Sequence, residues 1–355
     1  MHPAPVIPRP VPAAAVSPQR GSGAELRRGA YRLLLVAAGV YDLALGAMLA
    51  LAAETPFGWL GMEIPGRLVW RCAGAAIALF GVLYLHAARR KERARTIALL
   101  GLAAKVLAPA ALLAGLALGA GEAWWRLLPL AATSALVWWI PLAALLLDGT
   151  RGADLVRRAT PWVCAGLHGA AGLAMLFVLR GGTEAEPSQA ARMAYVGAHA
   201  AAWRAGFAVW MAAGMSVLAF YAWWASWLRR PGIALAALVV AFAGLACDLT
   251  GEALYAGWLP LLASDAAGFG HVQRVGTALT SVYANGFYTL AGIVLTLGTP
   301  GLPRRVGALA WVVWSAGIAL SVCGAMGWAA GLVAASGILF PGLVLLAVLL
   351  AREPR

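Results

Sequence analysis

Long apolar segments separated by short polar ones run along almost the whole chain. A helix needs about 20 mostly apolar residues to cross the hydrocarbon core of a bilayer. Segments that satisfy this rule cover residues 31–53, 68–88, 97–119, 124–147, 161–180, 198–227, 232–256, 275–298, 306–327 and 330–351. The pattern predicts an all-α, polytopic integral membrane protein with ten transmembrane helices. Only the stretch GWAAG, residues 327–331, separates the last two of them.

Composition and charge agree with this class. Of the 355 residues, 62% are hydrophobic and 12% are charged, against about 25% charged in soluble domains. The net charge is +13. If the N-terminus is cytoplasmic, the inner loops and tails hold 19 Lys and Arg and the outer loops five. Because positive residues favour the cytoplasmic side, we expect both termini in the cytoplasm of a bacterium, with the protein in its inner membrane. The charge then needs no nucleic-acid partner.

Polar stretches divide the chain into modules. Residues 1–29 are rich in Pro and Ala and are expected to be a disordered basic tail. Residues 30–148 form a four-helix membrane module, and 149–160 a charged cytoplasmic linker. A six-helix membrane module, 161–355, follows. The four cysteines show no CxxC spacing and predict no disulfide framework.

Three stretches of the first module resemble a known family. They are YDLALGAML at 41–49, GVLYLHAARR at 81–90 and LVWWIPLAALLL at 136–147. Over about residues 30–148 the chain is similar to the DoxX-like family of four-helix bacterial membrane proteins. The resemblance implies a membrane-embedded helical bundle and, for some members, quinone-coupled redox chemistry. The second module is similar only to membrane proteins without an assigned activity.

Two opposite charges lie at matching depth in the first module. Asp42 is eleven residues from the inner end of its span and Lys105 about nine, so both lie roughly 14–17 Å deep. A charge in the middle of a bilayer costs about 2.5–3.5 kcal/mol, which favours pairing. Gly39, Asp42 and Gly46 share a helical face that should pack against another helix. We therefore predict a buried Asp42–Lys105 ion pair.

Polar residues gather near the outer ends of the spans of the second module. Asp248, Glu252 and Tyr255 share one helical face. The next span carries a polar stripe at steps of three and four, made of Arg274, Thr277, Ser281, Asn285 and Tyr288. Such a stripe must face protein or water. The residues predicted to converge on one outward-facing pocket are His199, Trp203, Arg204, Asp248, Glu252, Tyr255, His271, Arg274, Ser281, Tyr283 and Asn285.

Several functions fit this pattern. We favour binding or transport of a small molecule through the pocket, because no nucleophile, phosphate-loop or metal-site spacing occurs. A membrane oxidoreductase or other intramembrane enzyme is the alternative. In a third reading, a structural subunit, Arg204 and Arg274 would neutralise Asp248 and Glu252. On an ideal helix Arg204 points about 140° away from His199, so Arg204 reaches the pocket only by extending sideways.

Histidine pairs at matching depth are the remaining candidates for cofactor chemistry. His86 with His168, or His199 with His271, could flank a haem. His199, His271, Asp248 and Glu252 are suitable metal-ligand types but lack a metal-site spacing. We therefore predict no metal and no cofactor. The expected partners are the lipid bilayer and a small-molecule ligand, and the oligomeric state stays open.

Overall fold

The computed structural model describes residues 20–64 and 66–353, and this part of the chain is helical without strands. Ten of its helices are long and apolar enough to cross a membrane, which confirms the predicted class. The first six helices are α1 (Arg20–Ala52), α2 (Glu54–Trp59), α3 (Arg67–Arg89), α4 (Lys91–Ala117), α5 (Leu128–Ala131) and α6 (Val137–Leu147). The others are α7 (Gly152–Ala174), α8 (Gln189–Ala198), α9 (Ala200–Ala225), α10 (Pro231–Gly257), α11 (Ala266–Thr277), α12 (Asn285–Gly298), α13 (Arg304–Ala325) and α14 (Ala329–Arg352).

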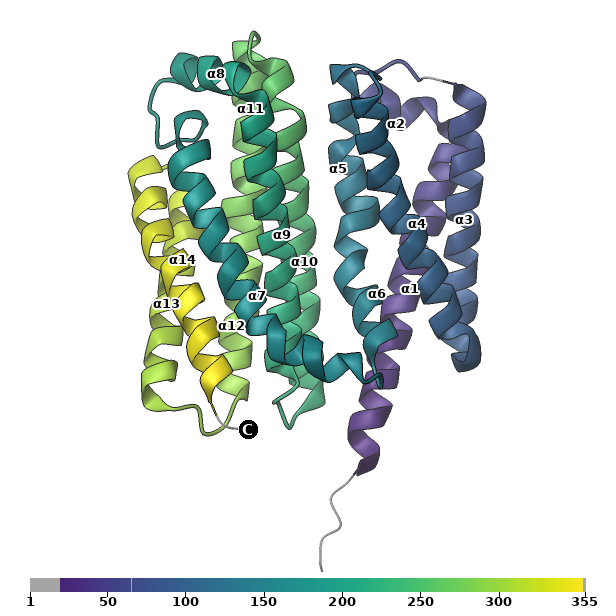
Figure 1. The fold of residues 1–355 in the computed structure, drawn as a ribbon, viewed down its shortest axis with the longest axis vertical. Helices are drawn as coiled ribbons and strands as arrows, with labels where there is room; N and C mark the ends of the chain where they lie inside the picture. Colours follow the sequence, from purple (N-terminus) through teal and green to yellow (C-terminus); the bar gives the residue numbers. More distant parts are fainter. Residues whose placement is uncertain (1–19, 65, 354–355) are drawn as a thin grey trace, which may run out of the picture.

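The helices form two groups that lie side by side, α1–α6 and α7–α14 (Figure 1). We call them the first and second group. The start of α1 and the end of α14 lie at one end of the molecule, which we call the terminal end. The short helix α8 lies at the opposite end, the α8 end. An even number of spans requires the first helix to begin and the last helix to end on the same side, as α1 and α14 do here.

Two segment predictions need correction. Residues 20–29 of the expected tail 1–29 are helical, because α1 begins at Arg20; residues 1–19 lie outside the described residues. The expected linker 149–160 is largely helical, because α7 begins at Gly152 and continues without a break through Pro161. A Pro at this position interrupts only part of the backbone hydrogen bonding. The chain therefore passes from one group to the other within a helix.

Glycine allows α1 and α3 of the first group to pack backbone to backbone. A Cβ atom on Gly46 would lie 2.3 Å from the backbone nitrogen of Ala78, and one on Gly74 would lie 2.4 Å from that of Ala50. Lipid provides no hydrophobic driving force between helices. Small residues let the backbones approach closely, and the resulting van der Waals packing stabilises the contact. The face that carries Gly39 and Gly46 is thus a helix–helix contact, as expected.

The second group is built around α9. In its most apolar stretch, 56% of the residues are buried within the protein, against 44% or less in every other predicted span. Trp203, Phe220 and Trp224 are fully buried along this helix. α10, α12 and α7 all contact α9. The polar residues of α10 that face α9 are therefore held inside the protein and away from lipid.

Three stretches inside the spans are π-helical: Ala132–Leu136, Met175–Leu179 and Ala278–Ala284. A π-helical turn contains more residues than an α-helical turn and rotates the side chains that follow it. The third stretch joins α11 to α12. It lies between the polar residues Thr277 and Asn285 of span eight.

Candidate functional site

Two carboxyl groups lie inside the second group, one turn apart on α10. Asp248 packs against Gly214 of α9, where an added Cβ atom would lie 2.8 Å from Asp248 Oδ2. The same oxygen accepts a hydrogen bond of 3.2 Å from the Tyr288 hydroxyl of α12. Glu252 is only 3% exposed. The two side chains share one face of α10 and repel each other electrostatically when both are ionised.

Within the described chain, no basic side chain pairs with these acids. The ion pairs there join Arg67 and Arg71 to Glu54, Lys105 to Asp42, Arg204 to Glu122, and Arg305 to Glu353. Arg274, the second cation expected near the acids, is exposed. The network in which Arg204 and Arg274 neutralise Asp248 and Glu252 is therefore not the one that forms.

Arg204 instead connects the two groups of helices. Its guanidinium lies 2.6 Å from Glu122 Oε2 and 4.3 Å from the ring centre of Trp125. Both partners precede α5 in the first group. Because Arg204 points away from the acid-bearing face of α10, it contacts the neighbouring group and leaves the predicted pocket.

One oxygen of Glu252 lacks a hydrogen-bond partner in the described part of the chain. Glu252 Oε2 is fully enclosed by protein atoms. Buried polar atoms are nearly always hydrogen-bonded, and each unpaired one costs free energy. A buried carboxylate oxygen without a partner costs free energy, and protonation of the carboxyl group or binding of a cation would reduce that cost. We call Asp248 and Glu252 the carboxyl pair.

Tyr255 connects the face of the carboxyl pair to the α8 end. Its hydroxyl lies 2.7 Å from Thr277 Oγ1 of α11. Thr277 Oγ1 in turn donates a hydrogen bond of 2.6 Å to Glu184 Oε1. Gly276 makes this crossing possible, because a Cβ atom there would lie 2.7 Å from the Tyr255 ring. A chain of oxygen atoms thus runs from α10 through α11 to the loop before α8.

The polar stripe of span eight does not stay on one face. Thr277 and Tyr288 contact α10 residues, as described above. Asn285 instead donates to Gly317 O at 2.7 Å and to Ser321 Oγ at 2.9 Å, both on α13. Asn285 directly follows the π-helical stretch, whereas Tyr288, three residues further along the same helix, bonds to Asp248 of α10. Asn285 therefore binds α13 and does not join the carboxyl pair.

The remaining predicted residues lie around the site but not in it. Trp203 donates from Nε1 to Tyr255 O at 2.8 Å and so ties α9 to α10. His199 is exposed at the break between α8 and α9 and stacks on Tyr195 at 4.4 Å. His271 and Tyr283 are exposed, and Ser281 is half-buried. The structure thus brings together Asp248, Glu252 and Tyr255, and separates these from the two histidines.

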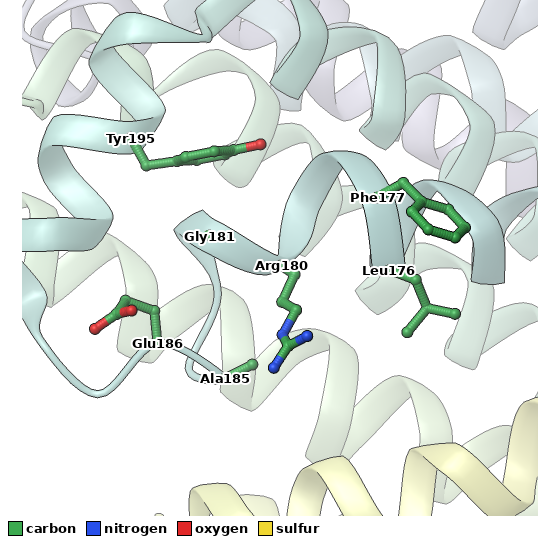
Figure 2. Close-up of a pocket in the computed structure, with 7 residues that line it drawn as sticks. All are labelled: Leu176, Phe177, Arg180, Gly181, Ala185, Glu186 and Tyr195. Atoms are coloured by element: carbon green, nitrogen blue, oxygen red, sulfur yellow. The ribbon is translucent and has the colours of Figure 1, made fainter.

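A cavity of about 370 Å³ lies beside the loop that carries Glu184 (Figure 2). The residues that line it are Leu176, Phe177, Arg180, Gly181, Ala185, Glu186 and Tyr195. In Figure 2 the Tyr195 ring lies over Gly181, and the Arg180 side chain points the same way as Leu176. Ala185 and Glu186 directly follow Glu184, so the cavity opens next to the end of the oxygen chain.

Sequence reasoning missed Glu184 and left Thr277 and Tyr288 out of the pocket. Thr277 and Tyr288 belong to the recognised stripe, so spacing gave a signal for them. Glu184 lies in the short loop GGTEAEPS between two spans. Nothing in that sequence distinguishes it from Glu186, since loop acids are common at a membrane surface.

The first group holds the ion pair that depth matching predicted. Lys105 Nζ lies 2.9 and 3.1 Å from the two oxygens of Asp42 and donates to Ser134 O at 2.8 Å. Asp42 is 3% and Lys105 7% exposed. Each charge is thus matched and hydrogen-bonded within the bilayer-spanning region. The Lys105 Nζ also lies 5.6 Å from the ring centre of Trp138.

Cofactor ligands do not gather in the described part of the chain. It contains no group of three or more His, Cys, Asp or Glu side chains placed to hold a metal ion. His168 is buried in α7, where its Nδ1 lies 2.9 Å from Cys164 O of the same helix. His86 is exposed on α3. His86 and His168 thus belong to different groups of helices.

These features define the class: a polytopic, all-helical membrane protein with an unpaired carboxyl pair inside its second group. Comparison with models of known families, with curated proteins and with solved structures finds no match. The resemblance to the DoxX-like family stays a prediction. Function is therefore argued from the site.

Proposed function

We propose that this protein transports a small solute across a bacterial inner membrane, and that the carboxyl pair Asp248–Glu252 binds a coupling proton or monovalent cation. The observation that supports this most directly is the enclosed, unpartnered Glu252 Oε2 on a helix without a neutralising base. Ionisable residues inside membrane spans that are not paired commonly mark ion pathways and proton relays.

The contacts of the pair support a role in binding more than one in architecture. A structural acid would be expected to have a fixed counter-charge, as Asp42 has in Lys105. Asp248 receives only the Tyr288 hydroxyl at 3.2 Å. Two acids one turn apart with a single weak donor carry up to two uncompensated charges. Binding one cation reduces the electrostatic repulsion between the two carboxylates. Occupancy of the ion site and the conformation of the protein therefore become linked.

The proposed orientation follows from the loop charges. The basic connections at residues 89–95, 151–158, 229–230 and 304–305 lie at the terminal end, and the loop before α8 lies at the other end (Figure 1). Under the positive-inside rule this places the α8 end in the periplasm. The carboxyl pair, in the α8-proximal part of α10, then lies closer to the periplasm than to the cytoplasm. Access of an introduced cysteine at Glu186 to a membrane-impermeant thiol reagent tests this orientation.

The proposed function is tested by ion-dependent stability of the purified full-length protein. Protons, Na⁺ and K⁺ are the probes, with thermal unfolding measured from about pH 5 to about pH 9. We expect the wild type to unfold at a higher temperature when protons or one of the cations are abundant, because a bound ion stabilises the state that binds it. Asp248→Asn with Glu252→Gln should lose this response.

Glu122→Gln is the matched control, because Glu122 is also an acid near the α8 end but pairs with Arg204. It should keep the full response. The proposal is contradicted if the double variant responds as the wild type does, or if the wild type responds to none of the three ions. Failure of both single variants, Asp248→Asn and Glu252→Gln, to fold would favour the structural reading instead.

A further inference from the structure

The oxygen chain that ends at Glu184 can be aligned in one hydrogen-bond direction. Thr277 Oγ1 lies within donating distance of two acceptors, Glu184 Oε1 at 2.6 Å and Gln273 O at 3.0 Å. The Tyr255 hydroxyl likewise lies 2.7 Å from Thr277 Oγ1 and 3.2 Å from Gln273 O. In each case the bond along the chain is the shorter one, and with both formed the two hydroxyls donate toward Glu184. Hydroxyl groups that all donate in one direction form a hydrogen-bonded chain along which stepwise proton transfer can occur.

The inner end of this chain lies next to the carboxyl pair. Tyr255 is three residues from Glu252 on the same face of α10, and both are buried. Gly251, beside Glu252, packs closely on Thr280 and on the Gly276 carbonyl. Glu252 and the Tyr255 phenol therefore share the interface between α10 and the helix of span eight. The remaining step from Glu252 to the Tyr255 hydroxyl is assigned to water.

The outer end is held in place by the loop before α8. Thr183 Oγ1 donates to Arg180 O at 3.0 Å, and the Ser188 N–H donates to Glu186 Oε1 at 3.0 Å. Arg192 donates to the carbonyls of Glu186 and Pro187. Glu184 itself is half-buried. The loop is thus fixed with one acid bonded to Thr277, and its residues Ala185 and Glu186 line the cavity of Figure 2.

Among the described residues, the charged groups near the oxygen chain do not form an ion pair with Glu184. From α8, the Arg192 guanidinium is engaged by two carbonyls and by Gln273 Oε1 at 3.2 Å. From α12, Tyr288 faces Asp248, and from α10 come Asp248, Glu252 and Tyr255 themselves. Within the described chain, no ion pair includes Glu184. Glu184 is therefore free to act as a proton acceptor.

We propose that Glu184, Thr277 and Tyr255 form the outer proton path of the carboxyl pair, with Glu184 as its port. This inference rests on the proposed function and makes the coupling ion a proton. In the release step, the Glu252 carboxylic acid gives its proton through water to Tyr255. Tyr255 passes its own proton to Thr277, and Thr277 passes its own to Glu184. One O–H bond breaks and one forms at each hydroxyl, and Glu184 finally releases the proton to bulk water.

A pH jump with infrared detection of protonated carboxylic acids tests the path on the full-length protein in lipid vesicles. Thr277→Val keeps the shape and removes the hydroxyl, and Glu184→Gln removes the port. Each should slow protonation of the carboxyl pair at least roughly tenfold. The extent of protonation at equilibrium should stay unchanged, because the acids themselves are intact. A merely structural role of Thr277 or Glu184 would alter stability but not this rate.

Two controls match these variants. Thr250→Val removes a hydroxyl that is bonded to Ala246 O of its own helix, only two residues from Glu252. Glu186→Gln neutralises an acid two residues from Glu184 on the same loop. Both should protonate at the wild-type rate. Wild-type rates in both Thr277→Val and Glu184→Gln would overturn the path.

Asp248→Asn with Glu252→Gln separates failure of the path from failure of the site. If this double variant loses the signal while Thr277→Val and Glu184→Gln keep wild-type rates, the path is wrong and the carboxyl pair remains the ion site. If the double variant keeps the signal, the proposed function itself is wrong. Stabilisation of the wild type by Na⁺ but not by protons would replace the proton with a metal cation and also overturn the path.

Discussion

Each of the two groups of helices has acidic side chains inside the membrane region, but the partners of these side chains differ between the groups. In the first group Asp42 has a lysine partner at 2.9 Å, and that lysine is further bonded to a backbone carbonyl. In the second group Asp248 and Glu252 have each other and one tyrosine hydroxyl. A paired charge fixes helices in place, whereas an unpaired one needs a mobile counter-charge. The contrast suggests that the first group is a support and the second holds the ion site.

The largest expected effect on the free energy of unfolding comes from removing the counter-charge of Asp42, which leaves the first group with an unpaired buried acid like those of the second group. Lys105→Met leaves Asp42 buried without a counter-charge and should lower the free energy of unfolding by about 3–5 kcal/mol. Equilibrium unfolding in mixed detergent checks this. Asp42→Asn combined with Lys105→Met removes both charges and should recover most of the loss. A small effect of Lys105→Met alone would mean that the first group tolerates an unpaired acid too.

Substitution of Arg204 tests whether this cation interacts with the carboxyl pair or with the residues of the first group that it contacts. Arg204→Gln removes the Glu122 ion pair and the contact with the Trp125 ring, and should cost about 1–2 kcal/mol. A double-mutant cycle with Glu122→Gln should show coupling, while a cycle with Glu252→Gln should show none. Coupling to Glu252 would restore the neutralising network that the contacts argue against.

Neutralising the carboxyl pair should change stability least among the buried acids. Asp248→Asn with Glu252→Gln removes two charges that have no counter-charge to lose, so the unfolding free energy should change by less than about 1 kcal/mol or increase. Asp42→Asn, measured in the same way, leaves Lys105 without a counter-charge and should lower the free energy of unfolding. Equal losses in the two groups would remove the distinction between a support and an ion site.

The smallest effect is expected at Glu54, an exposed acid beyond the end of the first span. The pKa of Glu54 lies below its ordinary value of 4.5, because its carboxylate accepts a backbone hydrogen bond and because Arg67 and Arg71 lie nearby. A lowered pKa in the folded state contributes stability above pH 4.5 that is lost as the pH falls through the folded value. Glu54→Gln should abolish this slight acid sensitivity in thermal unfolding.

The sequence predicted the spans well because insertion into lipid depends on local composition. All ten helices follow the apolar segments, and the short break near Gly327 does separate α13 from α14, with a φ of 65° at that glycine. Spans five and eight begin nine residues earlier than predicted, at Gly152 and Ala266. The added segments carry polar residues such as Arg157 and Arg158 in span five and His271 and Arg274 in span eight, so hydropathy gives a weak signal for them.

The candidate site was only partly predictable. Asp248, Glu252 and Tyr255 share a face because a continuous α-helix fixes their azimuths. Asn285 and Arg204 left the site for two reasons that lie outside such spacing. α13 supplies Gly317 and Ser321 as partners for Asn285, and the first group supplies Glu122 and Trp125 as partners for Arg204.

By itself, the sequence determined that the chain is a membrane protein, how many helices it inserts and which acids they carry, because these depend on the residues of each segment alone. It also determined that Asp42 and Lys105 could meet, since depth along a helix follows from counting. Only the tertiary structure decided that Arg204 leaves the acids, that Glu252 keeps an unpartnered oxygen and that Glu184 reaches Thr277. Those outcomes depend on helix rotation and on contacts between segments far apart in the chain, which local pattern does not encode.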